Sequence, residues 1–353
     1  MFSEKPMDSG QLHRRLKIVL ISTLPPVPCG VADYTELLQS HLQARGHTVE
    51  TITSNVWDIA KGFAIHRLLK MRGQGGVVHF QYPSLGFGAG LAPQVAALLS
   101  HALPTVVTLH EFSRVHLLRK MTILPFIFAT DHLIFTSEYE RKILSRVTPW
   151  IRNRSSVVGI GSNVPEPEGE IIRQQKTIGY FGTIRPDKGL EQYVELAEIM
   201  LKHDPTWNFL IMGVASNKTR AYMQGLMRLT AALPNIVWLI GMDMLSVSKR
   251  LASIRYVYLP FPDGASERRG SLLGALSCRT IVITTRGPHT TGDILGAVLI
   301  AESPAMALNE IVRLEKDSAL RHTMQKKSRY YVQERSWSQI VAKHELIYQR
   351  IIR

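Results

Sequence analysis

Short apolar runs alternate with helix-length segments along the whole chain. In the first half, these runs lie at 17–22, 48–53, 77–81, 105–109, 132–136 and 156–159. Continuous apolar runs of this length, separated by helices, are typical of parallel strands that are covered on both faces. Between the first two runs, apolar residues recur at helical spacing until Gly46 ends the pattern. The pattern therefore predicts a repeating unit of strand, helix and strand.

The same alternation starts again after a segment rich in proline, glycine and glutamate at 162–170. This composition is typical of a linker. We therefore predict an α/β fold with two Rossmann-like, doubly wound domains, the first at 1–165 and the second at 166–335. The segment 336–353 predicts a helix with one apolar stripe, and because such a stripe must be buried we expect this helix to pack back on the N-terminal domain.

Composition agrees with two globular domains and indicates the kind of partner. The chain has 353 residues, of which 45% are hydrophobic and 20% charged, and this length exceeds what one core normally holds. Its net charge of +14 favours anionic partners such as phosphates, nucleic acid or an acidic membrane face. No segment approaches the roughly 18 unbroken apolar residues of a spanning helix. Because its two cysteines are far apart and lack metal-ligand spacing, neither a disulfide scaffold nor a zinc module is expected, and a reducing compartment fits. We therefore expect a cytoplasmic protein that is soluble or attached to the inner face of a membrane only at its surface.

Candidate site residues follow the predicted strands, because open parallel sheets bind ligands beyond the carboxyl ends of their strands. Gly30 follows the first run and precedes a helix, where it allows a ligand to approach the backbone, although a plain turn is the alternative. His110 and Glu111 follow the run at 105–109, and a titratable pair at this edge can contact substrate. A structural histidine is the alternative there.

In the second domain, basic residues follow two of the predicted strands. Arg185 and Lys188 flank a proline turn just before a helix, an arrangement that suits a pyrophosphate. A later segment, 263–276, combines small and basic residues whose backbone amides could receive a phosphate or a sugar hydroxyl. Nucleic acid is disfavoured because no aromatic residues are interleaved with these basic ones. An oxidoreductase is disfavoured because no proper glycine fingerprint follows the first strand of either domain.

Four motifs in order resemble family 4 of the glycosyltransferases over nearly the whole chain. They are "PPVPCGVADYTELL", "FGTIRPDKGLE", "SLLGALSCRTIVITT" and "SW" with the final helix. The resemblance implies the GT-B fold, in which two Rossmann-like domains face a central cleft, with the acceptor site in the N-terminal half and the nucleotide-sugar site in the C-terminal half. It also implies a hexosyltransferase that retains configuration and needs neither a metal ion nor another cofactor. The chain accordingly has no Asp-x-Asp pair to hold a metal.

The resemblance also implies roles for individual residues. His110 would lie near the transferred sugar, while Arg185 and Lys188 would hold the donor diphosphate; these three are the predicted catalytic residues. The predicted donor-binding residues are Gly30, Gly182, Thr183, Ser266, Glu267, Arg268, Arg269, Gly270 and Ser271. The predicted acceptor-side residues are Tyr34, Gln81, Tyr82 and Glu111.

The chain departs from the family pattern in two places. Thr183 stands where the family usually has arginine, and Ser266 and Gly274 stand where it has two glutamates eight positions apart. Glu267 is one residue out of register. The prediction is therefore a nucleotide-sugar glycosyltransferase of polysaccharide or glycoconjugate biosynthesis, and the alternative is a GT-B protein without transferase activity that acts as a sugar- or nucleotide-binding regulator.

The expected partners are a nucleotide sugar and a glycan or lipid-linked acceptor. An anionic membrane surface is a further expected partner, because the segments 61–73 and 113–121 mix basic and apolar residues. Ordinary amphipathic helices with solvated charges are the alternative interpretation of these segments.

Overall fold

The computed structural model describes residues 15–27, 29–72, 75–110, 120–169 and 171–352. The chain divides into two compact units. Unit 1 contains the residues up to Val157 together with those from Val341 onward, and unit 2 is Val158–Ile340. The polypeptide therefore passes from unit 1 to unit 2 and back again.

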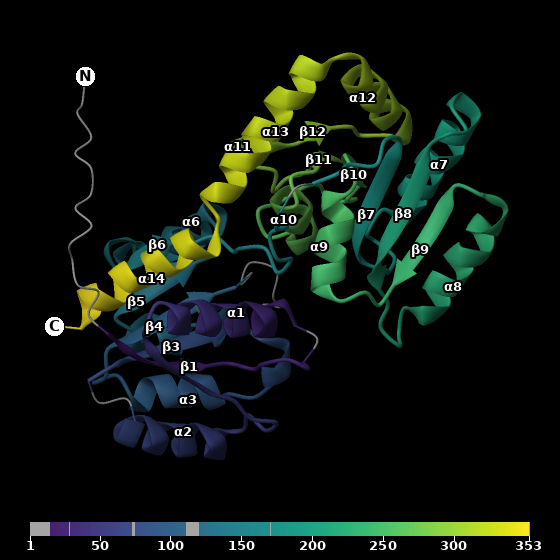
Figure 1. The fold of residues 1–353 in the computed structure, drawn as a ribbon. Helices are drawn as coiled ribbons and strands as arrows, with labels where there is room; N and C mark the ends of the chain where they lie inside the picture. The colour runs from purple at the N-terminus through teal and green to yellow at the C-terminus, as the bar shows by residue number, and fades with distance from the viewer. Residues whose placement is uncertain (1–14, 28, 73–74, 111–119, 170, 353) are drawn as a thin grey trace, which may run out of the picture. The chain divides into compact units, whose positions relative to one another are not determined.

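The described part of unit 1 contains a six-stranded parallel sheet in the order β2-β1-β3-β4-β5-β6 (Figure 1). Its strands are β1 Lys17–Ile21, β2 Thr48–Ile52, β3 Val77–Tyr82, β4 Thr105–Leu109, β5 His132–Phe135 and β6 Ser155–Val157. Its helices are α1 Gly30–Ala44, α2 Ile59–Arg72, α3 Ala92–Leu99, α5 Leu124–Ala129, α6 Glu138–Val147 and the last part of α14 Trp337–Ile351, with short 3-10 helices η1 Leu85–Phe87 and η3 Pro149–Arg154. Figure 1 shows α1 on one face of the sheet and α2 with α3 on the other.

The described part of unit 2 contains a second six-stranded parallel sheet, in the order β12-β11-β10-β7-β8-β9. Its strands are β7 Thr177–Thr183, β8 Asn208–Val214, β9 Ile236–Ile240, β10 Tyr256–Leu259, β11 Ile281–Thr284 and β12 Leu299–Ile300. Its helices are α7 Leu190–His203, α8 Arg220–Leu229, α9 Met244–Ala252, α10 Gly270–Ser277, α11 Gly292–Ala297, α12 Pro304–Lys316 and α13 Ser318–Gln333, with the short η4 Thr230–Ala232.

Each sheet has its own hydrophobic core. The central strands are buried along their whole length, as β3, β4, β10 and β11 show, because helices cover both faces of a parallel sheet. In unit 2, α7 packs beside α12, while α13 packs beside α10 and α11. The predicted α/β class and the two doubly wound sheets are confirmed.

The last part of α14 is fastened to unit 1 by a buried carboxylate. Glu345 Oε1 lies 2.8 Å from Arg45 Nε and 2.7 Å from His47 Nε2. Burial alone would raise the pKa of Glu345, but the hydrogen bonds from His47 and Arg45 lower it below its usual value. Because this carboxylate is ionised at neutral pH, α14 is tied to the connection between α1 and β2 by charge-assisted hydrogen bonds.

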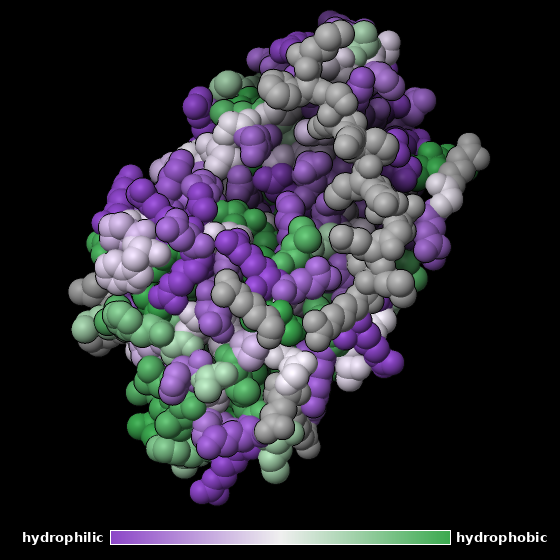
Figure 2. Space-filling view, turned by 90° about the vertical axis from the view of Figure 1, so that its left-hand side faces the viewer, coloured by the Kyte–Doolittle hydropathy of each residue, from purple (hydrophilic) through white to green (hydrophobic). Residues whose placement is uncertain are grey.

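One helix of unit 1 presents a mixed apolar and basic stripe to solvent. Large exposed residues of α2 recur at helical spacing, and we call five of them the α2 face: Ile59, Phe63, Arg67, Lys70 and Met71. Figure 2 shows hydrophobic residues in several groups on one side of the molecule, among hydrophilic ones. Apolar patches at the surface are common sites of interaction.

Candidate functional site

The candidate site of unit 2 lies between two neighbouring strands whose following connections run in opposite directions along the sheet. β7 and β10 are adjacent, but α7 leads from β7 to β8 whereas α10 leads from β10 to β11. Ligands bind to open parallel sheets at such a topological switch point. Gly189 has a φ of +74°, and a Cβ at this position would collide with Pro260 O at the end of β10. Only glycine therefore allows the loops 183–189 and 260–269 to pack side by side.

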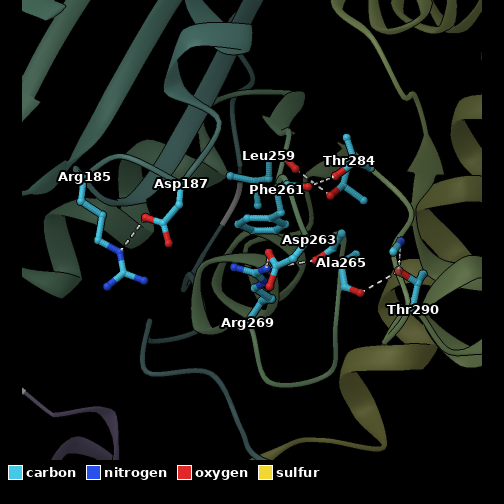
Figure 3. Close-up of polar contacts among 12 residues, drawn as sticks. Arg185, Asp187, Leu259, Phe261, Asp263, Ala265, Arg269, Thr284 and Thr290 are labelled. Carbon is cyan, nitrogen blue, oxygen red and sulfur yellow. Dashed lines mark hydrogen bonds and ion pairs between the residues drawn. The ribbon is translucent and has the colours of Figure 1, made fainter. Parts of the chain in front are cut away.

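Three cations lie around this switch point. Lys188 is partly buried, and its pKa is lowered by burial and then by the positive charges of Arg269 and Arg185. Arg185 is exposed, and its Nε lies 3.4 Å from Asp187 Oδ1 (Figure 3). Asp187 and Asp263 offset part of this positive charge. A bound anion would remove the remaining repulsion among the three cations, so the geometry suits a diphosphate.

Arg269 is held in place by three neighbours of its own loop. Its Nη2 donates to Asp263 Oδ1 and, at 3.2 Å, to Gly264 O. Its guanidinium lies 4.1 Å from the centre of the Phe261 ring (Figure 3). Because its side chain is only 10% exposed, Arg269 is a fixed charge that braces the loop.

The end of β7 lies against the start of α10. A Cβ built at Gly182 would lie 3.4 Å from Ser271 Cβ, and Thr183 is exposed beside it. Gly270, the first residue of α10, is also exposed, whereas Ser266 is buried in the preceding loop. The structure thus brings the predicted donor-binding residues Gly182 and Ser271 together, at a helix start whose free backbone N–H groups favour anions.

Glu267 is engaged away from the three cations. Its Oε1 accepts a hydrogen bond from Thr291 Oγ1 at 3.0 Å and lies 3.6 Å from Nη2 of Arg335. Arg335 in turn stacks on Tyr331, with 3.9 Å between the guanidinium carbon and the ring centre. At Gly274, a Cβ would lie 2.7 Å from Val164 Cγ2, so a glutamate does not fit there. Position 274 therefore supplies no carboxylate, and the carboxylate of Glu267 already has partners in its own unit.

The switch point of unit 1 lies between β1 and β3. The connections after these strands are linked, since the hydroxyls of Thr23 and Ser84 are hydrogen-bonded and Leu85 N donates to Cys29 Sγ at 3.5 Å. Gly30 is the exposed first residue of α1, and apart from its neighbours in the chain no atom of the described residues lies within 4 Å of the position that a Cβ would take. A ligand can therefore approach the backbone at Gly30 closely.

His110 directly follows β4 and is buried. Its Nε2 lies 2.8 Å from Gln81 Oε1, and its ring meets that of Tyr34 edge-on, with 5.1 Å between the ring centres. Burial, and then the neighbouring His344, lower the pKa of His110 to about 3. The imidazole is therefore neutral at pH 7 and carries one N–H.

The other predicted acceptor-side residues lie in different surroundings. Tyr34 is buried, and burial raises its pKa, so its hydroxyl stays protonated. Tyr82 is also buried, with its Oη 2.6 Å from Thr122 Oγ1, and its backbone oxygen accepts a hydrogen bond from His110 N at 2.7 Å. Glu111 lies outside the described residues.

Sequence reasoning missed several residues that hold this site together. Phe261 and Asp263 fix Arg269; Asp263 lies in the predicted segment 263–276 without a role of its own, and Phe261 lies outside it. His79 lies beside Gln81, with 3.2 Å between their Nε2 atoms, and the period of two along β3 could have indicated this. Tyr348 of α14 reaches His79 from 269 positions away, and no local pattern could have shown that.

No known family model and no curated protein matches this sequence. Solved structures do match its fold. A glycosyltransferase from Rickettsia africae ESF-5 superposes with a TM-score of 0.73 at 14% identity, covering 96% of this chain and 99% of that one. HepE from Anabaena, in complex with UDP and glucose, gives 0.70 at 13% identity, covering 95% and 100%. A sucrose-phosphate synthase from Thermosynechococcus elongatus gives 0.68 at 16% identity, covering 96% and 99%. At these identities the likeness shows the fold, which is GT-B.

Two further findings bear on the surroundings of the site. Within the described ranges, no cluster of histidine, cysteine, aspartate and glutamate side chains is placed to hold a metal ion. Among the helices of the same ranges, none is long and apolar enough to cross a bilayer.

Proposed function

We propose that this chain is a nucleotide-sugar glycosyltransferase, of the retaining, metal-independent type found in glycosyltransferase family 4, that acts in polysaccharide or glycoconjugate biosynthesis. One observation carries the proposal. At the switch point of unit 2, Arg185 and Arg269 lie close enough to Lys188 for their charges to lower its pKa, and positive charge gathered in this way suits a diphosphate. The shared fold supports it, since the Anabaena protein is in complex with UDP and glucose.

The proposed reaction assigns a role to each part of the site. Lys188 and Arg185 hold the donor diphosphate and stabilise the charge that develops as it leaves. The acceptor hydroxyl attacks the anomeric carbon from the face on which the diphosphate departs. The bond between the anomeric carbon and the phosphate oxygen breaks, the new glycosidic bond forms, and the hydroxyl proton passes to the departing phosphate. His110 contacts the transferred sugar, and Gly30 allows close approach of the ligand.

A second candidate is a sugar- or nucleotide-binding regulator without transferase activity. The surroundings of Gly274 and Glu267 favour it, since position 274 supplies no carboxylate for a nucleotide ribose and one oxygen of Glu267 is engaged by Thr291. The alternative explanation is that the protein is a transferase that uses a different nucleotide-sugar donor.

One pair of measurements separates these candidates. We expect one nucleoside diphosphate among UDP, GDP and ADP to raise the melting temperature more than CMP does, because a ligand of the native state stabilises it according to its occupancy. The corresponding nucleotide sugar should then be slowly hydrolysed in the absence of an acceptor, with release of the diphosphate. Binding without hydrolysis or transfer would favour the regulator, and no stabilisation by any nucleotide would contradict both candidates.

We also propose that unit 1 associates with an anionic membrane surface through the α2 face. Phe63 and Met71 of this face are 50% and 70% exposed and can enter the membrane–water interface. Arg67 and Lys70 then bind lipid phosphates. Most of the predicted segment 113–121 lies outside the described residues and carries none of this argument.

The membrane proposal predicts sedimentation with anionic liposomes at low salt and release at high salt. Lys70→Glu should reduce the bound fraction severalfold, since each cation near the surface contributes about 1 kcal/mol. Lys218→Glu, an equal charge change on an exposed side chain of unit 2, is the control and should bind like the unmodified protein. Failure of the unmodified protein to sediment at low salt would overturn the proposal.

A further inference from the structure

Four buried side chains form a continuous hydrogen-bonded line in unit 1. His110 Nε2 lies 2.8 Å from Gln81 Oε1, Gln81 Nε2 lies 3.2 Å from His79 Nε2, and His79 Nδ1 lies 2.6 Å from Tyr348 Oη. Gln81, His79 and Tyr348 are completely buried, and His110 is 6% exposed. The line thus runs from α14, across β3, to the end of β4.

The chemistry of the amide sets the direction of these hydrogen bonds. An amide oxygen only accepts, so the Nε2–H of His110 must donate to Gln81 Oε1. Gln81 Nε2 lies 3.2 Å from Nε2 and 3.5 Å from Nδ1 of His79, so the amide N–H group points at the face of the imidazole ring, and this keeps the amide oxygen turned toward His110. Burial, followed by His344 and His110, lowers the pKa of His79 well below its usual value. His79 is therefore neutral and carries a single ring proton.

Two hydroxyl groups hold the ring of His79 beneath this amide. Tyr348 Oη lies 2.6 Å from its Nδ1 and Thr108 Oγ1 lies 2.7 Å from its Nε2. Because both ring nitrogens are hydrogen-bonded, the ring presents its face to Gln81 in a fixed orientation. The strand geometry supports it, because His79 and Gln81 are two residues apart on β3 and share one face.

We propose that Gln81, held by His79 and by Tyr348 of α14, is a positioning residue that fixes His110 as its Nε2–H tautomer. Nδ1 of His110 then carries only a lone pair, and it has no hydrogen-bond partner in the described part of unit 1. It accepts a hydrogen bond from a ligand hydroxyl and rejects a ligand that offers only an acceptor. This assignment of a sugar hydroxyl to Nδ1 rests on the proposed function, whereas the tautomer does not.

The tautomer is measured directly by long-range ¹H–¹⁵N NMR of the histidine rings, with His110→Ala to assign the signals. We expect His110 to carry its proton on Nε2 in the ligand-free protein. Gln81→Met removes the amide at similar length, so the Nδ1–H form of His110 should appear. Gln94→Met is the matched control, because this buried glutamine of α3 makes no hydrogen bond within the described ranges, and it should leave both rings unchanged. A proton on Nδ1 of His110 in the unmodified protein, or an unchanged His110 spectrum in Gln81→Met, would overturn the inference.

Ligand binding tests the role of Nδ1 separately, with UDP and UDP-glucose as probes. Gln81→Met should weaken the binding of UDP-glucose about threefold to tenfold, the equivalent of one hydrogen bond, and should leave the affinity for UDP unchanged. Equal effects on both ligands would overturn the contact between Nδ1 and the sugar. If the unmodified protein binds no nucleotide at all, the proposed function fails, and the Nε2–H tautomer in the same sample would still support the role of Gln81.

Discussion

Lys188→Ala is expected to weaken binding of the preferred nucleoside diphosphate by about 1.5 to 3 kcal/mol, or about 10- to 150-fold. Lys188 is partly buried between Arg185 and Arg269, where its charge is costly without an anion. A diphosphate would therefore gain a charge-assisted hydrogen bond that the alanine variant cannot supply. Isothermal titration calorimetry of the two proteins with the same nucleotide measures the difference.

The matched control for this prediction is Lys176→Ala. Lys176 also belongs to unit 2 and also forms an ion pair, with 2.9 Å between its Nζ and Asp204 Oδ2, but it precedes β7 at the opposite end of that strand. The control should bind the nucleotide like the unmodified protein. Equal dissociation constants for Lys188→Ala and the unmodified protein would place the diphosphate elsewhere.

Gly189→Ala is expected to lower the free energy of unfolding by about 3 kcal/mol or more. The backbone at Gly189 is left-handed, with a φ of +74°, and the added Cβ would collide with the backbone oxygen of Pro260. Either the loop 183–189 or the end of β10 must move, and nucleotide affinity should fall with the displacement of Lys188. Urea denaturation followed by tryptophan fluorescence measures the loss of stability.

Gly225→Ala provides the control for this substitution. Gly225 lies within α8, and no atom lies within 4 Å of the position that its Cβ would take. Alanine should stabilise this helix by about 0.5 to 1 kcal/mol, because it loses less conformational entropy than glycine on folding. A Gly189→Ala protein as stable as the unmodified one would show that the two loops are not packed as described.

Much of the fold could be predicted because the determining signals are local. The apolar runs that form β1, β3 and β4 are continuous, and apolar residues between them recur at helical spacing. The fold class and the succession of strands and helices along the chain could therefore be predicted from periodicity. The pattern also predicts where strands end, and Lys188 and His110 are predicted site residues because they follow such ends. Gly189 belongs to the same motif, but glycine is required there because a Cβ would collide with the backbone oxygen of Pro260. Pro260 is 71 positions away, so no local pattern predicts this contact.

The partners of the candidate site residues could not be predicted, because they depend on packing between distant elements. The sequence predicts Arg269 as a donor-binding residue, and in the structure Phe261 and Asp263 hold its guanidinium group. Glu267 was only one residue out of register with the family pattern, yet its carboxylate is engaged by Thr291 and Arg335. A single sequence reports which side chains are present at a strand end, but not which of them already have partners.

Unit 1 is built from two segments of the chain that are far apart in the sequence, and this affects the order in which the two units can fold during synthesis. Unit 2 is one continuous segment, so its core can form as soon as Ile340 has left the ribosome. Unit 1 lacks Glu345 and Tyr348 until the last part of α14 has been made, and His47 and His79 have no partners from α14 before then. The hydrogen-bonded line that orients His110 is therefore completed last, after both sheets have been synthesised.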